Sequence, residues 1–318
     1  MLKTLFTLRG TLDTKTSAIL SILGFVLALL IWFGLAEVMS KKIIKQIDKP
    51  ESELQIKDKK YYHQDSLLVA DYNLLEKLND AQLADYGLHQ EKVYPQLPSP
   101  LSVVKSFSEL VSKDGLVANS LFSIKLNLLG YILAIVIAIP LGFILGLIPL
   151  FRGLFSKLVD SVRFIPLTAV TGIFIMWFGL GSEMKVLFLA FGILVYLIPV
   201  VVQRINEVDD VHLKTVFTLG ANAWQTIWTV YLPYVMSKLI DDIRVLTAIS
   251  WTYITIAEML NKGGGIGEMI WMAKRQSRID KAFAILIVIV LIGILQDRIF
   301  YYLDRFLFKF KHINDDHK

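Results

Sequence analysis

Residues 126–148 of the chain read LNLLGYILAIVIAIPLGFILGLI, an uncharged run long enough to cross a membrane as one helix. A bilayer core requires about 20 consecutive apolar residues per helix, because unpaired backbone groups are costly in hydrocarbon. Gly142 and Gly146 stand four residues apart in this run, a spacing that lets two helices pack closely, and we expect that contact within one chain. The stretch therefore predicts an all-α integral membrane protein.

Five further apolar runs complete the expected set of membrane spans. They are Ala18–Ala36, Phe164–Leu180, Val186–Val202, Ile243–Leu260 and Ala282–Leu295. The first is longer than the core of a signal peptide, roughly 7–15 residues, so we interpret it as a retained anchor. The last is short, and it can span if Lys281 and Arg298 extend to the two interfaces. The prediction is six helices.

Composition agrees with a membrane protein. Of the 318 residues, 55% are hydrophobic and 19% are charged, whereas soluble domains average about 45–50% apolar and about 25% charged residues. The chain has no cysteine, which excludes disulfides, zinc–thiolate sites, iron–sulfur clusters and thiol nucleophiles. Residues 41–114 hold 11 lysines and 12 acidic residues. This concentration of charge predicts one polar insert in an otherwise apolar chain.

The expected organisation follows from the spans and the insert. Residues 1–37 form a tail and the first helix, 38–100 an extracytoplasmic insert, 101–300 the core with five spans, and 301–318 a cytoplasmic tail. The insert is either a cap that contacts a partner or covers the pathway entrance, or a solvated spacer with one or two short helices. Leu67–Leu88 has loosely helical spacing. His63 and His89 are isolated, so no metal site is expected.

Charge alone does not settle the orientation in the membrane. Short loops rich in Lys and Arg tend to face the cytoplasm. Pro149–Arg163 and the C-terminal tail favour the cytoplasm, but lysines also follow the first span, and residues 261–281 hold five basic residues. Six spans place both termini on one side, and we expect that side to be the cytoplasm.

Val208–Pro233 repeats apolar residues at helical spacing twice. The first set is Leu213, Val216, Phe217 and Gly220, and the second is Trp224, Ile227, Trp228, Tyr231 and Leu232, with Pro233 just past them. Gly220 suits a left-handed cap, and Asn222 with Gln225 has the spacing of a capping box. We therefore expect two short amphipathic helices joined by a tight turn. The alternative is a helix pair lying on lipid headgroups with tryptophan anchors.

This segment resembles the EAA loop of bacterial ATP-binding-cassette importer permeases, because Gly220 is followed after nine residues by Val230-Tyr231-Leu232-Pro233. Further motifs occur in order along residues 97–311 and resemble the nitrate/sulfonate/taurine branch of that family. They are Leu97-Pro98-Ser99-Pro100, Ile139-Pro140-Leu141-Gly142 with Gly146, Ile165-Pro166, Trp177-Phe178-Gly179-Leu180-Gly181, Leu219-Gly220-Ala221 with Trp224-Gln225, Ala257-Glu258-Met259 and Gly265-Ile266-Gly267.

The resemblance implies a six-helix permease bundle in the bacterial inner (plasma) membrane, with a cytoplasmic coupling hairpin at 203–238. It implies a pathway for a small anionic solute, an ATP-binding-cassette ATPase dimer, a second permease copy and an extracytoplasmic substrate-binding protein as partners, and no nucleic acid. The chain itself is then no enzyme and binds no cofactor, since ATP and Mg belong to the ATPase. The coupling residues implied are Lys214, Phe217, Gly220, Ala221, Asn222, Trp224, Gln225, Leu232 and Pro233.

Two departures from the family pattern stand out. Lys214-Thr215-Val216 occupies the place of Glu-Ala-Ala, so the ATPase contact has either adapted to acidic groups on the partner or become weaker. The insert at 38–96 is also longer than the usual link, which puts the ordinary extracytoplasmic partner in doubt.

The fifth span is unusually polar, and Trp251, Tyr253, Thr255 and Glu258 are candidates to line the pathway. A charge within a span costs roughly 2.5–3.5 kcal/mol on insertion scales. Glu258 is therefore either a pathway or gate residue or an interfacial one that snorkels, and snorkelling is the preferred interpretation for Asp242 and Arg244. Residues 263–267, Gly-Gly-Gly-Ile-Gly, lack the Lys-Ser/Thr of a phosphate loop and favour a turn.

The alternative functions are a secondary transporter driven by protons or sodium and a membrane-embedded enzyme. The first predicts a carboxylate deep within a span and an inverted repeat, and none is evident. The second requires convergent catalytic groups, and neither HExxH nor GxSxG is present. An ATP-driven importer permease is the favoured function.

Overall fold

The computed structural model describes residues 13–46 and 88–311. These fall into two compact units, the first ending at Ser106 and including Ser277–Asp280, and the second comprising Phe107–Gln276 and the chain from Lys281 onward. The second unit holds most of the expected permease core, and each unit is considered by itself.

The first unit contains α2, Thr14–Val38, whose side chains are apolar on nearly all sides and mostly exposed. A helix that is hydrophobic all round is typical of a membrane span. Two strands follow it in sequence, β1 (Lys41–Gln46) and β2 (Leu88–Val93), and they pair antiparallel from Lys41 opposite Val93 to Gln46 opposite Leu88. The polar insert thus begins and ends on one ribbon, a feature that was not predicted. His63 and residues 67–87 lie outside the described residues.

Three side-chain contacts tie the end of α2 to β2 and to the residues that directly follow it. The indole N–H of Trp32 donates to the Pro98 carbonyl at 3.0 Å. The hydroxyl of Tyr94 donates to Glu37 at 2.9 Å, and Lys92 forms an ion pair with the same carboxylate. Glu37 holds the pKa of the Lys92 ammonium above its usual range through that hydrogen bond. The residues that follow the insert therefore lie against the end of the helix that precedes it.

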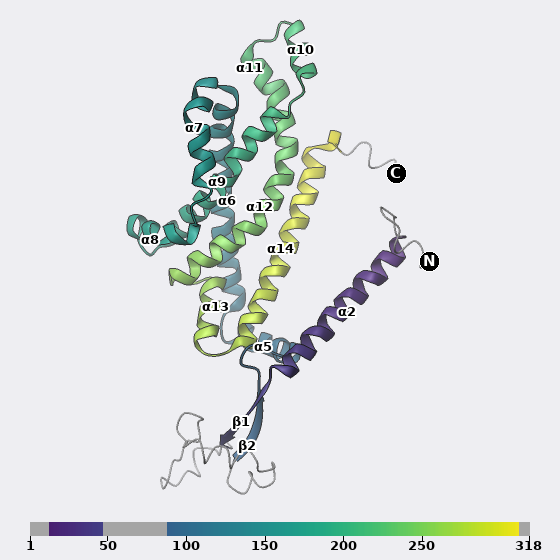
Figure 1. Cartoon of the computed structure of the whole chain (residues 1–318), viewed down its shortest axis with the longest axis vertical. Helices are drawn as coiled ribbons and strands as arrows, with labels where there is room; N and C mark the ends of the chain where they lie inside the picture. Colours follow the sequence, from purple (N-terminus) through teal and green to yellow (C-terminus); the bar gives the residue numbers. More distant parts are fainter. Residues whose placement is uncertain (1–12, 47–87, 312–318) are drawn as a thin grey trace. The chain divides into compact units, whose positions relative to one another are not determined.

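Among the described residues of the second unit, all regular secondary structure is helical (Figure 1). Its order is the end of α5 (Pro100–Ser112), α6 (Leu116–Leu147), α7 (Pro149–Val162), α8 (Leu167–Phe178), α9 (Ser182–Asn206), α10 (Asp210–Thr218), α11 (Ala223–Thr226), α12 (Leu232–Leu260), α13 (Ile266–Arg275), α14 (Ile279–Leu307) and the short 3-10 turn Lys309–Lys311. The all-α membrane class that the sequence predicts is confirmed.

The predicted close contact at Gly142 and Gly146 is present within this unit, between α6 and α9. A Cβ added at Gly142 would lie 2.5 Å from Val201, and one at Gly146 would lie 2.6 Å from Ile205. Only glycine lets the two helices approach this closely, because interiors are already packed to crystal-like density.

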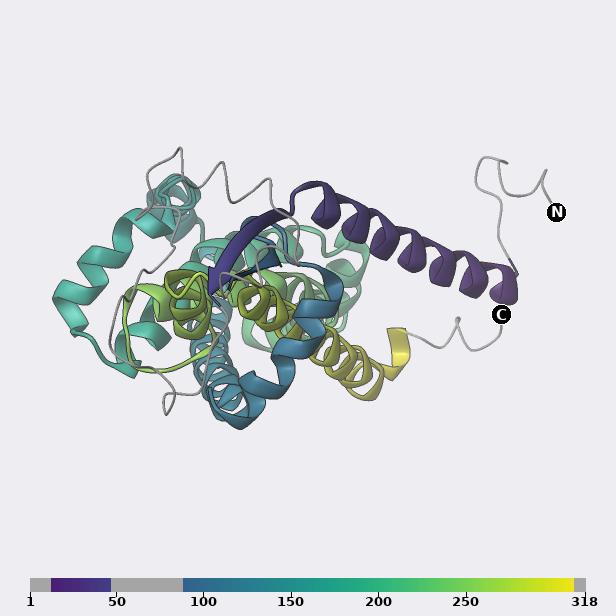
Figure 2. The same cartoon turned by 90° about the horizontal axis from the view of Figure 1, so that it is seen from below.

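The predicted span Phe164–Leu180 is wrong as a single helix. Only 12 residues, α8, are helical, and they rise about 18 Å where a bilayer core is about 30 Å thick. Pro166 lies just before α8 and disfavours helix at the preceding residue, and Gly179, with φ of 72°, ends it. The axes of α7 and α8 differ by 103° (Figures 1 and 2). Five described helices can span a membrane, or six if this bent pair counts as one span.

The last span is longer than its apolar run. α14 has 29 residues, and it is long and apolar enough to cross a membrane. Lys281 does not extend to an interface as expected, since its side chain is buried and pairs with Asp114 at 2.6 Å and Glu109 at 3.1 Å. The two carboxylates offset the cost of burying the ammonium within the protein.

Candidate functional site

The hairpin between α9 and α12 has the local geometry that its sequence predicts. Asp209 caps α10 by accepting a hydrogen bond from the Val211 N–H at 2.9 Å. The helix ends at Thr218, and Gly220, two residues further on, has a φ of 80° in the left-handed region that glycine tolerates best. The N–H of Ala221 reaches back to the Val216 carbonyl at 3.1 Å and closes the turn. The left-handed glycine is therefore confirmed.

The capping box is also confirmed. The Gln225 N–H donates to the Asn222 side chain at 2.8 Å, and the Asn222 N–H donates to the Gln225 side chain at 2.9 Å. Two backbone donors that a helix start leaves unpaired are thus satisfied reciprocally. The turn between α10 and α11 is held by its own residues.

The second hairpin helix does not end near Pro233, contrary to expectation. α11 runs through one π-helical turn, Ile227–Tyr231, directly into α12, and Pro233 is the second residue of that helix. Proline is tolerated in a first helical turn, and elsewhere its ring clashes with the carbonyl four residues earlier. Here that carbonyl belongs to Thr229, inside the wider π turn, which relieves the clash.

The tip of the hairpin exposes large apolar side chains. Trp224 is 66% exposed and Trp228 53%, and their rings meet edge to face at 5.6 Å. Phe217 and Leu219 are also exposed. Of the nine predicted coupling residues, all but Ala221 and Leu232 are exposed, and those two are half-buried. The tip projects beyond the ends of α9 and α12 (Figure 1). An apolar surface of this kind is characteristic of an interaction site.

The pathway candidates of α12 face other helices of the same unit. Trp251 is buried and donates to the Gln296 side chain at 2.8 Å, and Tyr253 lies against Gly192 of α9. The hydroxyl of Thr255 donates to the carbonyl of Trp251 in its own helix, as hydroxyl side chains in helices often do. These three side chains thus contribute to helix packing here, and their role in a pathway stays a prediction.

Glu258 is fully buried, so it is not an interfacial residue that snorkels. Its carboxylate accepts hydrogen bonds from the Ser123 hydroxyl at 2.6 Å and from the Gly267 N–H at 2.9 Å. Ser123 in turn accepts the Ile266 N–H at 2.8 Å. The unpaired N–H groups at the start of α13 are therefore capped by side chains of α6 and α12, and the helix dipole stabilises the carboxylate there.

The glycine turn at 263–265 is closed by the chain's own carboxylate. The N–H groups of Gly263 and Gly264 donate to Glu268 at 3.0 and 2.5 Å. The bond from Gly264, followed by the one from Gly263, holds the pKa of the Glu268 carboxyl below its usual range. Lys185 donates to the Gly264 carbonyl at 3.1 Å. The donors that a phosphate loop would present are occupied, in agreement with the predicted turn.

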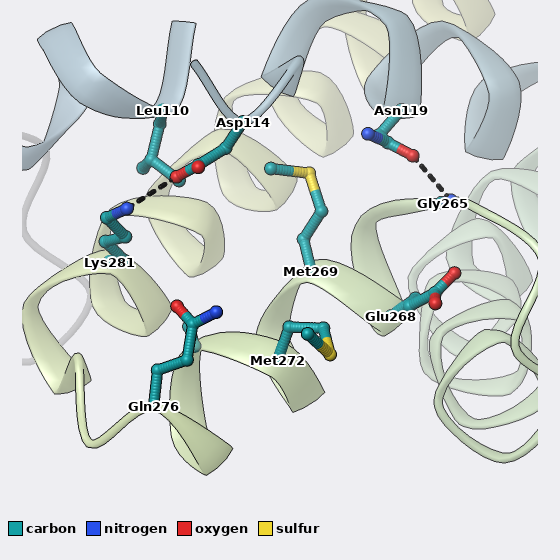
Figure 3. Close-up of a pocket in the computed structure, with 10 residues that line it drawn as sticks. Leu110, Asp114, Asn119, Gly265, Glu268, Met269, Met272, Gln276 and Lys281 are labelled. Atoms are coloured by element: carbon teal, nitrogen blue, oxygen red, sulfur yellow. Dashed lines mark hydrogen bonds and ion pairs between the residues drawn. The ribbon is translucent and has the colours of Figure 1, made fainter.

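A cavity of about 260 Å³ lies beside this turn (Figure 3). Its wall is formed by Leu110, Asp114, Asn119, Gly265, Glu268, Met269, Met272, Ala273, Gln276 and Lys281. The charges of the wall already have partners, since Lys281 pairs with Asp114 and Glu268 accepts backbone N–H groups. Asn119 accepts the Gly265 N–H at 2.8 Å. Sequence reasoning missed Asn119, Ser123 and Lys185, because each meets its partner only in the folded chain.

Asp242 and Arg244 do not snorkel as expected. Asp242 forms a bidentate ion pair with Arg204 of α9, with both nitrogen-to-oxygen distances 2.7 Å. Arg244 pairs with Asp297 of α14. Both charged residues therefore join α12 to neighbouring helices within the unit.

Comparison with known proteins agrees with these features. Residues 127–309 match the model of the binding-protein-dependent transport system inner membrane component. The chain is 31% identical over 211 residues to an ABC transporter permease protein of Methanocaldococcus jannaschii, covering 65% of this chain and 78% of that protein. It is 29% identical over 219 residues to a protein of Bacillus subtilis named as a transport permease for aliphatic sulfonates, covering 68% and 78%.

The fold is similar to that of a solved permease. A chain in the structure titled as an inward-facing conformation of the MetNI methionine ABC transporter superimposes with a TM-score of 0.55. The match has 16% identity and covers 60% of this chain and 94% of that one, so it concerns the fold alone. The family match covers more than half of the chain, and the structure is a helical membrane fold with an exposed hairpin. The chain belongs to the family of binding-protein-dependent transport system inner membrane components, the permeases of ABC importers.

Proposed function

We propose that two copies of this chain form the pathway of an ATP-driven importer, and that a separate ATPase dimer drives them through the hairpins. The observation that carries the proposal is the exposed apolar tip, with Trp224 and Trp228 both more than half exposed. A groove on a partner protein would cover this surface. Preorganisation by the capping box and Gly220 lowers the entropic cost of such binding.

The tip also offers a charge to its partner. Lys214 lies exposed on α10, beside the apolar residues of the tip. Charged groups at the rim of an interface favour a complementary partner and speed its association. An acidic patch at the edge of the ATPase groove is therefore the expected counterpart, which would explain a lysine where the family pattern has glutamate.

The proposed orientation places the hairpin and both termini in the cytoplasm. The hairpin and α13 lie at opposite ends of the second unit (Figure 1), so the glycine turn would then face the extracytoplasmic side. A substrate-binding protein would deliver the solute to that side. ATP and Mg would be bound by the ATPase and not by this chain.

The proposed solute is a small anion. The Bacillus relative carries a name that refers to aliphatic sulfonates, and this name is the basis of the proposal. Nitrate and bicarbonate belong to the same chemical class and serve as further probes.

The test uses the full complex with its ATPase and binding protein in proteoliposomes. ATP enclosed in the vesicle lumen, which takes the place of the cytoplasm, should drive uptake of a labelled alkanesulfonate or another of these anions. Gly220→Asp should abolish both ATPase co-purification and uptake, because aspartate strains the turn and charges the tip. Lys157→Gln, an exposed change on α7, is the matched control. ATPase that never co-purifies, or uptake driven by a proton or sodium gradient without ATP, would favour a secondary transporter instead.

A further inference from the structure

Four charged residues at the base of the hairpin form a compact set, which we call the charge clamp: Arg204, Glu207, Lys238 and Asp242. The guanidinium of Arg204 donates to both oxygens of Asp242 at 2.7 Å and to both oxygens of Glu207 at 2.8 and 2.9 Å. Lys238 lies 3.6 Å from Glu207. Arginine is suited to this place, because its planar fork can meet two carboxylates at once.

The clamp joins the two stems from which the hairpin projects. Glu207 directly follows α9 on the entry side, and its backbone carbonyl accepts the hydroxyl of Tyr234 on the exit side at 2.9 Å. Arg204 belongs to α9 and Asp242 to α12, and the two helices pack side by side (Figure 1). Entry and exit are therefore linked by side chains as well as by the chain itself.

The same stretch of α12 is also tied to the chain beyond α14. Asp241 pairs at 2.7 Å with Lys311, and Arg244 pairs with Asp297. Three charged residues within four positions of α12 thus reach three different partners. Because of these contacts, a displacement of α12 near Asp242 would also displace α9 and α14.

The clamp balances its own charges. Two cations face two anions, and the side chains of Arg204, Glu207 and Asp242 are only 24%, 30% and 18% exposed. Arg204 holds the pKa of the Glu207 carboxyl below its usual range by hydrogen bonding. Partly buried ion pairs contribute little net stability, because desolvation offsets their attraction, yet they restrict geometry. The clamp is therefore better explained by positioning than by stability.

The exit side of the hairpin contains an irregular helical turn between α11 and the charge clamp. The π turn Ile227–Tyr231 separates α11 from α12. π turns interrupt the regular hydrogen-bond pattern of a helix and are frequent at functional sites. Force applied at the tip could bend the helix here and fail to move α12.

We propose that Arg204 is a positioning residue that makes the end of α9 and the start of α12 move as one body, so that displacement of the tip passes into α12. The proposal rests on the proposed function, since it presumes an ATPase that moves the hairpin. Without the clamp, the π turn would absorb the displacement, and ATP hydrolysis would continue without transport.

The test measures solute imported per ATP hydrolysed by the full complex in proteoliposomes. Arg204→Gln should retain ATPase binding and hydrolysis while the ratio falls by about tenfold, within the range of measured coupling energies. Asp242→Asn, a change that keeps the side-chain shape, should act in the same direction. Arg204→Lys should lie between, because an ammonium cannot bond both carboxylates in fork geometry. Lys157→Gln again serves as control.

A distance measurement separates positioning from a merely structural role. The chain has no cysteine, so spin labels can be attached at Thr218→Cys on the tip and Val245→Cys on α12, both exposed. In the otherwise unchanged protein the distance between labels should be the same with and without ATP. In the Arg204→Gln background, ATP should shift or broaden it.

An unchanged import ratio in Arg204→Gln and Asp242→Asn would overturn the proposal, and so would hydrolysis that falls in parallel with import. A distance that changes with ATP even when Arg204 is present would also overturn it. If the unchanged complex imports solute without ATP, the proposed function itself fails, whatever the variants do.

Discussion

The hydroxyl of Ser123 donates a hydrogen bond of 2.6 Å to the carboxylate of Glu258, a residue 135 positions later in the chain. The same oxygen of Ser123 accepts the backbone N–H of Ile266. One hydroxyl thus connects α6, α12 and α13. A carboxylate within a span is costly unless its bonds are satisfied, and here the start of a helix satisfies it.

Replacing this hydroxyl should destabilise the protein. Ser123→Ala would leave the Ile266 N–H without its acceptor and one oxygen of Glu258 without its donor, although the Gly267 N–H still reaches the other oxygen, at about 1–3 kcal/mol for each buried group left unpaired. Thermal unfolding in detergent should show a clear fall in midpoint. Ser112→Ala removes an exposed hydroxyl that bonds only its own helix, and its midpoint should stay near that of the unchanged protein. Equal midpoints for the two variants would contradict this account of Ser123.

Acid should weaken the glycine turn through Glu268. Its pKa is lowered by hydrogen bonds from Gly264 and then Gly263, so the folded state binds its proton less readily than the unfolded state. The resulting stability is complete above the ordinary carboxyl pKa of about 4.3 and is lost as pH falls through the lower folded value. Unfolding midpoints measured from neutral to acidic pH should fall more steeply in the unchanged protein than in Glu268→Gln. Parallel curves would rule out this contribution.

Two glycine-to-alanine changes should have opposite effects. A Cβ at Gly142 would lie 2.5 Å from Val201, whereas one at Gly293 would meet nothing within 4 Å. Gly142→Ala should cost about 1–3 kcal/mol through overpacking of α6 against α9. Gly293→Ala should be neutral or stabilise by up to about 1 kcal/mol, since alanine favours helix. Denaturation in matched detergent measures both, and an innocuous Gly142→Ala would show that α6 and α9 can separate.

Reversing the charge of Lys214 should weaken ATPase binding. An exposed interfacial charge contributes up to about 1 kcal/mol, so Lys214→Glu should reduce affinity by up to about fivefold at low salt. The difference should shrink as salt is raised, because screening removes it. Binding of the purified ATPase at two ionic strengths measures this effect, with Lys157→Glu as the matched control. Tighter binding by Lys214→Glu would mean that the partner surface is basic.

The sequence predicted best where partners lie close together along the chain. Asn222 and Gln225 are three residues apart, and Gly220 ends a helix whose face is visible in its own spacing, so both caps were predictable. The ribbon between β1 and β2 was not, because it pairs residues on either side of the insert. Periodicity records which face of a helix is apolar, but it does not record which distant residue meets that face.

Charged residues in spans show the same limit. Lys281, Asp242 and Glu258 were each weighed against a lipid interface, since the sequence alone offers no partner for them. Their actual partners come from distant parts of the chain: Asp114 from the link between α5 and α6, Arg204 from α9 and Ser123 from α6. The short α8 was missed for a different reason, because an apolar run measures composition and not where the chain turns.

The π turn at Ile227–Tyr231 sets the direction in which the tip faces. Its hydrogen bonds span one residue more than those of an α-helix, and each residue corresponds to about 100° of rotation about the axis. Trp224 is therefore rotated relative to the buried stripe of α12 by roughly that angle, compared with an uninterrupted helix. A single-residue deletion in this turn would preserve the helix and the composition of the tip while aiming its aromatic rings elsewhere. The helical phase across these five residues thus determines which way the chain presents itself to a partner.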